Sequence, residues 1–166
     1  RVSFGGSYGT GSLLFDGRAV LTAAHLFEGL TGSASVTFET RSGTQTLNAS
    51  KTLIHPAYDK THNNNDLALV WLTSTAPMSA NRFDIYRDKD EIGQSFILAG
   101  YGRTGTGSAG ATSNTASPIR LKADNKFDAD ASTLKSYLST TPTSSIASLT
   151  VSSSMTDSQS SKSLSS

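Results

Sequence analysis

The segment Val20-Leu21-Thr22-Ala23-Ala24-His25-Leu26 decides how this chain is interpreted. An apolar run ends in two alanines and a histidine, a pattern that favours a strand closing in a tight turn. The residues from Ala23 to Glu28 suffice for one helical turn and no more. Forty-one residues after His25 the chain reads Asn64-Asn65-Asp66-Leu67-Ala68-Leu69. An aspartate therefore opens a second apolar run.

The first 105 residues have the same β character throughout. Short runs rich in Val, Ile, Leu, Phe and Thr alternate with Gly, Asn and Asp, which is typical of strands and turns. Asp16-Gly17 predicts a two-residue hairpin turn, and the overall spacing predicts an all-β sandwich or closed barrel. The expected strands are Val2 to Tyr8, Gly11 to Phe15, Arg18 to Thr22, Ala34 to Thr40, Thr44 to Ile54, Leu67 to Leu72 and Ser95 to Tyr101.

His25 and Asp66 together suit one kind of chemistry. An imidazole titrates near pH ~6.5, so it can take and return a proton at neutral pH. A carboxylate that accepts the second ring N–H fixes the tautomer and stabilises the imidazolium. These are the base and orienter of a Ser-His-Asp hydrolase. The alternative interpretation is an ordinary histidine at a strand end and an aspartate that caps a turn.

Four blocks in sequence order resemble the first half of a trypsin/chymotrypsin-like serine protease, over residues 1 to about 123. The first is similar to the strand before the family's histidine, the second to its histidine box, the third to its aspartate box, and the fourth to its Gly-aromatic-Gly strand. The blocks are Gly11-Ser12-Leu13-Leu14, Leu21-Thr22-Ala23-Ala24-His25, Ile54-His55-Pro56-Ala57-Tyr58 with Asn65-Asp66-Leu67-Ala68-Leu69, and Leu98-Ala99-Gly100-Tyr101-Gly102-Arg103-Thr104.

The resemblance implies a fold and an activity. The fold would be a six-stranded antiparallel Greek-key barrel, the first barrel of a trypsin-like double barrel, followed by an irregular Ser/Thr-rich C-terminal tail. The activity would be peptide-bond hydrolysis through an acyl-enzyme, with His25 as general base, Asp66 as its orienter, and a protein or peptide as substrate. An extracellular protein is expected, with no signal peptide in this chain. The absence of cysteine resembles the bridge-free bacterial branch.

The nucleophilic serine is not identified in the sequence. The family places it in a Gly-Asp-Ser-Gly-Gly-Pro box, whose glycines let backbone N–H groups converge on the oxyanion. This chain has no glycine after Gly110. The Gly-flanked Ser108 comes only 42 residues after Asp66, and the resemblance gives it no such role.

Three explanations remain open for the missing serine. The chain is a truncated, cleaved or mis-translated protease whose second half is replaced by a Ser-rich tail. Alternatively it is a catalytically dead protease-like binding module, or one part of an enzyme completed by a second chain. In each case we expect this chain alone to be inactive. A Gly-Asp-Ser-Gly-Gly-Pro box in another reading frame beyond codon 123 would establish the first.

The remainder of the chain predicts little packed structure. Residues 106–118 are mostly Gly, Ser, Thr and Ala and predict a linker after the 1–105 barrel. Within 119–138, Ile119 to Lys122 predicts a strand and Asp130 to Leu138 a short helix. Fifteen of the last 35 residues are Ser and six are Thr. Residues 139–166 have too few large apolar side chains to offset the entropy of ordering, so disorder is expected there.

Metal sites have weak support in the sequence. His25, His55 and His62 lack the spacing of a zinc site. Asp128 and Asp130 match the first and third ligands of a calcium loop, but the expected Gly and the twelfth Glu are Thr133 and Ser139. We therefore expect no cofactor, with calcium as a weak candidate.

The overall charge argues against two classes of main partner, nucleic acid and anionic membranes. The chain has 14 Lys and Arg against 13 Asp and Glu, whereas nucleic acid and anionic membranes attract a concentrated basic surface. No apolar run approaches the ~20 residues of a membrane span.

Overall fold

A computed structural model describes residues 1–102, 105–106, 108, 110–111, 118–130, 133 and 136. The tail at 139–166 and most of the helix expected at Asp130 to Leu138 lie outside the described residues. Contacts divide the chain into two compact units. The first comprises Arg1–Tyr86 with Gly100–Gly102, and the second comprises Arg87–Ala99 with the described residues after Gly102. In the described part of the chain, no helix has the length and apolar character that crossing a bilayer requires.

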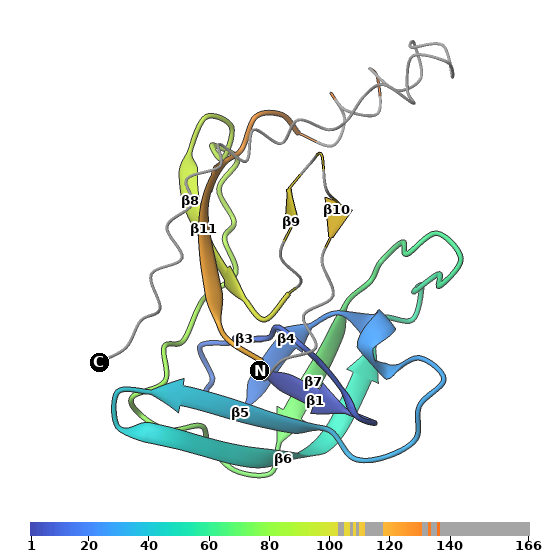
Figure 1. The fold of residues 1–166 in the computed structure, drawn as a ribbon, viewed down its shortest axis with the longest axis vertical. Coiled ribbons are helices and arrows are strands. Elements are labelled where there is room, and N and C mark those ends of the chain that lie inside the picture. Colours follow the sequence, from blue (N-terminus) through green and yellow to red (C-terminus); the bar gives the residue numbers. More distant parts are fainter. Residues whose placement is uncertain are drawn as a thin grey trace. The chain divides into compact units, whose positions relative to one another are not determined.

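The first unit is a curled antiparallel sheet of seven strands, drawn in blue to green in Figure 1. Their spatial order is β2-β1-β5-β6-β7-β4-β3. The strands are β1 (Val2–Phe4), β2 (Ser7–Gly9), β3 (Ser12–Leu13), β4 (Ala19–Thr22), β5 (Ser35–Thr40), β6 (Gly43–Ile54) and β7 (Ala68–Leu72), with a single 3-10 turn, η1 (Ala24–Phe27), after β4. The all-β, barrel-type prediction is confirmed, as is the single helical turn.

Six of the seven strands expected from the sequence lie in this sheet, and it has seven strands because the run from Val2 to Tyr8 is a hairpin. The seventh expected strand, Ser95 to Tyr101, belongs to another sheet. Gly5 and Gly6 have φ values of 55° and 87°, in the left-handed region that glycine enters without a steric cost. They reverse the chain, so that Ser3 pairs with Tyr8.

β6 produces the curl of the sheet. Its first half pairs with β5, from Gly43 to Asn48. Its second half pairs with β7, and the register shifts between Ala49 and Lys51. A bulge of this kind bends a strand and increases its twist, so one long strand joins two differently oriented parts of the sheet (Figure 1).

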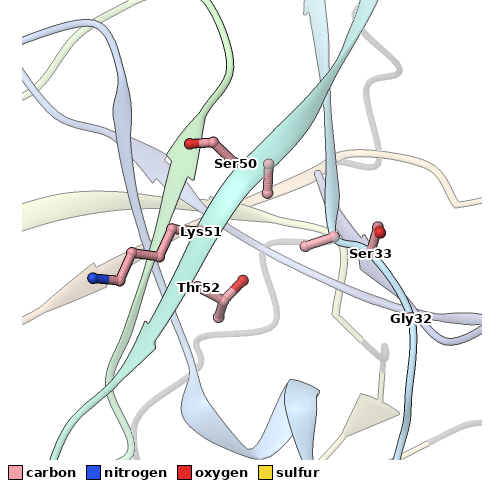
Figure 2. Close-up of a pocket in the computed structure, with 7 residues that line it drawn as sticks. Gly32, Ser33, Ser50, Lys51 and Thr52 are labelled. Carbon is pink, nitrogen blue, oxygen red and sulfur yellow. The ribbon is translucent and has the colours of Figure 1, made fainter.

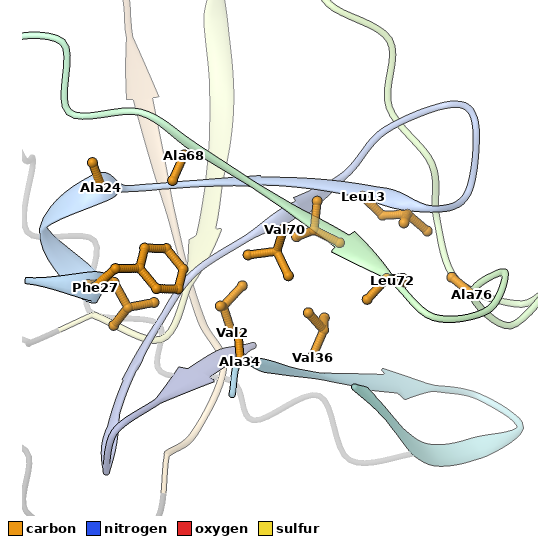
Figure 3. Packing of buried hydrophobic residues seen from close by; sticks show 12 residues of the cluster. Val2, Leu13, Ala24, Phe27, Ala34, Val36, Ala68, Val70, Leu72 and Ala76 are labelled. Atoms are coloured by element: carbon orange, nitrogen blue, oxygen red, sulfur yellow. The ribbon is translucent and has the colours of Figure 1, made fainter. Parts of the chain in front are cut away.

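The core lies on the inner face of this sheet. In β7 the side chains of Ala68, Val70 and Leu72 are buried, whereas Trp71 is 38% exposed, as expected for a strand with one face inward. Figure 3 shows the buried side chains gathered between the strands. The ring of Phe27, from η1, contacts that of Phe4 edge-on at a centroid distance of 5.0 Å. The turn after β4 is therefore anchored to the core.

The described residues of the second unit contain two short pairs of strands. β8 (Ser95–Gly100) pairs with β11 (Leu121–Lys126), and β9 (Gly105–Thr106) pairs with β10 (Gly110–Ala111). β11 begins two residues after the strand expected from Ile119. The rings of Phe96 and Phe127 stack at 4.3 Å beside the β8–β11 pair.

Candidate active site

The turn η1 presents His25 to solvent. Ala24, Leu26 and Phe27 are all less than a tenth exposed, whereas the side chain of His25 is 60% exposed. The small side chain of Ala24, which is 0% exposed, lets this turn pack closely against the sheet. Burial of its neighbours thus leaves the imidazole as the outward-facing group of the turn.

The register between β4 and β7 places Asp66 at the same end of the sheet as His25. β4 and β7 are antiparallel neighbours, and Thr22 lies opposite Ala68. The chain continues from Thr22 to His25, and it enters Ala68 from Asp66. In an antiparallel pair the end of one strand adjoins the start of the other. Residues 41 positions apart are therefore brought together.

Both oxygens of the Asp66 carboxylate contact His25. Oδ2 lies 2.7 Å from the ring Nδ1, and Oδ1 accepts a hydrogen bond from the backbone N–H at 2.8 Å. An ionised carboxylate only accepts hydrogen bonds, so Nδ1 carries the proton and Nε2 carries the lone pair. This bidentate contact fixes both the tautomer and the direction of the ring.

The environment of Asp66 keeps it ionised. Its side chain is 24% exposed. Burial favours the neutral acid, but hydrogen bonds from the ring and backbone N–H of His25 outweigh burial and hold the pKa of Asp66 below its usual value. An ionised carboxylate beside a neutral imidazole stabilises the cation that forms when Nε2 takes a proton. The pair is therefore suited to general base catalysis.

A second hydrogen bond near this pair was not predicted from the sequence. The Tyr58 hydroxyl donates to Oε1 of Glu28, the residue directly after η1. This bond, with burial and the neighbouring carboxylates, raises the pKa of Tyr58 to about 12. The Ile54-His55-Pro56-Ala57-Tyr58 block marked Tyr58 as part of a motif, but no sequence signal linked it to Glu28.

The other candidate residues are not brought to this pair. His55 Nδ1 accepts from the backbone N–H of Ala57 at 3.2 Å, and His62 Nδ1 lies 2.6 Å from Asp59 Oδ2. Within the described ranges, no three His, Asp or Glu side chains are grouped to hold a metal ion.

The remaining candidates belong to the second unit. Asp128 and Asp130 are exposed in the segment after β11, and Asp130 Oδ1 accepts from the backbone N–H of Thr133 at 2.6 Å. Ser108 is also exposed there.

A pocket of about 160 Å³ opens where β6 leaves β5 to pair with β7. It is lined by Gly32, Ser33, Ala34, Ala49, Ser50, Lys51 and Thr52, none of which belongs to the His25–Asp66 pair. Figure 2 shows the Lys51 side chain pointing away from Ser33. The Ser50 hydroxyl donates to the carbonyl of Trp71 at 3.1 Å. The Ser50 hydroxyl is therefore already engaged, and the Lys51 amine lies away from Ser33 on the other side of the pocket lining.

Comparison with known proteins finds a matching family and a similar fold. The model of the family named Trypsin matches residues 1–156, which extends beyond the four motif blocks. A search of curated proteins finds no match. A solved structure described as "Structure of GrC" is similar in fold, with a TM-score of 0.58 and 21% sequence identity, over 81% of this chain and 59% of that one. The chain thus spans about three fifths of the length of that structure.

Proposed function

The chain belongs to the trypsin family, and we propose that it supplies the histidine and aspartate of an extracellular serine endopeptidase. His25 is the general base, and Asp66 holds its ring. The substrate is a protein or peptide chain. The observation that carries the proposal is the bidentate contact between Asp66 and His25, at 2.7 and 2.8 Å.

The roles of the two residues follow from this contact. With its Nδ1 proton held by Asp66, the ring presents the Nε2 lone pair to solvent, where a serine hydroxyl can donate to it. Nε2 takes the hydroxyl proton as the oxygen attacks the peptide carbonyl, and it returns that proton to the leaving amine. Asp66 remains ionised throughout and stabilises the intermediate imidazolium.

The nucleophilic serine of this proposal comes from outside the present sequence. No serine here lies in a Gly-Asp-Ser-Gly-Gly-Pro box, and glycine ends at Gly110. Without that box the backbone donors for the oxyanion are missing, and each is worth roughly 3–4 kcal/mol. The chain alone therefore carries the base but does not turn over substrate.

A fluorophosphonate probe tests the proposal, because only an activated serine becomes covalently labelled. We expect no labelling of this chain alone. We expect labelling when a family C-terminal half that contains the serine box is supplied in the same chain or in trans. His25→Ala and Asp66→Asn should then abolish or strongly slow the reaction.

The outcomes separate the proposal from its alternatives. Labelling that persists at full rate in His25→Ala would remove the role of general base. Labelling of this chain alone at one serine would place the nucleophile within the chain. A completed chain that folds, remains unlabelled and binds peptide would identify a protease-like binding module.

A further inference from the structure

The two segments that hold His25 and Asp66 are weakly supported by their own local structure. η1 has four residues, and its N-terminal end has no side-chain cap. A single 3-10 turn has little stability of its own. Asp66 ends a loop in which Asn63 and Asn65 adopt left-handed backbone angles. A partly exposed contact between a carboxylate and an imidazole contributes little by itself, so it needs support from elsewhere.

Tyr58 and Glu28 supply a second connection between the same two segments. The Tyr58 hydroxyl, in the loop before Asp66, donates to the carboxylate of Glu28. Glu28 follows η1 directly, and its backbone N–H donates to the carbonyl of His25 at 3.2 Å. Glu28, which accepts the hydrogen bond from Tyr58, therefore also closes the turn that carries His25.

A short series of contacts within the loop links Tyr58 to Asp66. The Tyr58 ring packs against the core, and its backbone N–H donates to His55 O at 3.0 Å. The next link is Asn65, whose Nδ2 donates to the carbonyl of Ala57 at 3.0 Å. Asn65 has a φ of 54°, a conformation that asparagine tolerates better than most residues. Asp66 comes immediately after Asn65, so Asn65 sets its direction.

Two contacts thus join the aspartate loop to the histidine turn. One is between Asp66 and His25, and the other is between Tyr58 and Glu28. We infer that Tyr58 and Glu28 are positioning residues: their hydrogen bond clasps the aspartate loop to the histidine turn and keeps the Asp66 carboxylate aligned with both N–H groups of His25. We call this hydrogen bond the Tyr58–Glu28 clasp. Its catalytic consequence rests on the proposed function, whereas its effect on the His25–Asp66 contact does not.

The Tyr58–Glu28 clasp is a hydrogen bond that should persist throughout the neutral pH range. A hydrogen bond between a hydroxyl and an ionised carboxylate is about twice as strong as one between neutral groups. Because the pKa of Tyr58 is raised to about 12, the hydroxyl keeps its proton throughout the neutral range. Tyr58 therefore remains a donor to Glu28 throughout that range.

The experiment follows the Nδ1 proton of His25 in the full chain by NMR with ¹⁵N-labelled histidine. A proton held between Nδ1 and Asp66 exchanges slowly with water. In Tyr58→Phe, which keeps the packed ring, we expect this proton to exchange about tenfold faster, equivalent to about 1.4 kcal/mol. Glu28→Ala should have the same effect, whereas Glu28→Gln, which keeps an acceptor oxygen, should restore slow exchange.

Tyr8→Phe is the matched control, because it removes a hydroxyl from β2, in the same unit, that makes no hydrogen bond within the described part of the chain. It should leave the exchange rate unchanged. If Tyr58→Phe fails to fold, Glu28→Ala carries the same test without altering the tyrosine ring.

Three results would overturn the clasp: unchanged exchange in both Tyr58→Phe and Glu28→Ala, an equal acceleration in Tyr8→Phe, or no slowly exchanging His25 proton in the unaltered chain. The proposed function is judged separately. Labelling of the completed enzyme that requires His25, together with exchange indifferent to Tyr58, removes the clasp alone. Exchange that depends on Tyr58, together with a folded completed enzyme that is never labelled, removes the proposed function alone.

Discussion

Replacing Asp66 with asparagine should invert the tautomer of His25. In the unaltered chain both aspartate oxygens accept, one from the ring Nδ1 and one from the backbone N–H. An asparagine has one acceptor oxygen and one amide donor. The backbone N–H cannot change, so the oxygen turns to it and the amide N–H₂ faces the ring. Two donors cannot share a hydrogen bond, and the ring must move its proton to Nε2.

The size of this effect follows from the bond that is lost. A hydrogen bond to a charged group contributes about 1.5–3 kcal/mol. Because about 1.4 kcal/mol is a factor of ten, the ratio of Nδ1–H to Nε2–H tautomers should fall by roughly 10- to 150-fold. A ring protonated at Nε2 has no lone pair facing a serine. In the completed enzyme kcat should then fall roughly 10⁴-fold, the loss established for this family's triad rather than one calculated from this chain.

Long-range ¹H–¹⁵N correlation spectra of the histidine rings measure the tautomers without any turnover. Asp59→Asn is the matched control, because Asp59 contacts His62 Nδ1 at 2.6 Å in the same way but in a more exposed pair. It should alter His62 and leave His25 unchanged. The reasoning is refuted if His25 keeps its Nδ1 proton in Asp66→Asn, or loses it in Asp59→Asn.

Three further predictions concern titration and packing. The pKa of Tyr58 is raised from 10.0 to about 12, which favours the folded state while the phenol is neutral. The free energy of unfolding should therefore fall as the pH rises from 10 to about 12. Alkaline unfolding curves of Tyr58→Phe should lack that part of the decline. The pKa of Asp66 is lowered because hydrogen bonds from His25 outweigh burial. The ionised Asp66 carboxylate therefore stabilises the fold above its ordinary pKa, and this stabilisation is lost as the pH falls through the lowered pKa. In His25→Ala, ¹³C spectra should show a higher pKa for the Asp66 carboxyl. Leu72 is 0% exposed, so Leu72→Ala should lower the free energy of unfolding in urea by about 3 kcal/mol. Leu67→Ala, at a side chain that is 48% exposed, should lower it by about 1 kcal/mol. Equal costs for the two variants would contradict the assigned core.

Much of the first unit was predictable because its signals are local. Ala68–Leu72 is a short run of five apolar residues, which predicts a strand, although the alternation between its buried and exposed side chains appears only in the structure. The meeting of His25 and Asp66 was predicted from the ordered motif blocks, and the structure places the two side chains in contact. By contrast, the run from Val2 to Tyr8 was interpreted as one strand, because the flanking apolar residues concealed the turn at Gly5 and Gly6.

The Tyr58–Glu28 clasp could not be predicted in the same way. The two residues are 30 positions apart, and neither has a spacing or a neighbour that marks the other as its partner. Asn65 is similar, because its left-handed φ and its bond to Ala57 depend on how the whole loop closes. Local patterns predict elements and motif residues, whereas contacts between loops depend on tertiary packing.

The register of β4 and β7 links the stability of the core to the chemistry of the site. Val20 lies opposite Val70, and both are almost fully buried. If β7 slipped by one residue, its inward-facing side chains, Val70 among them, would turn to the outer face of the sheet, and exposing Val70 would cost about 1.5–3 kcal/mol. The same slip would move Asp66 by about 3.4 Å along the sheet relative to His25, which is beyond hydrogen-bonding reach of one or both N–H groups. The burial of apolar side chains that favours this register therefore also favours the contact on which the proposed base catalysis depends.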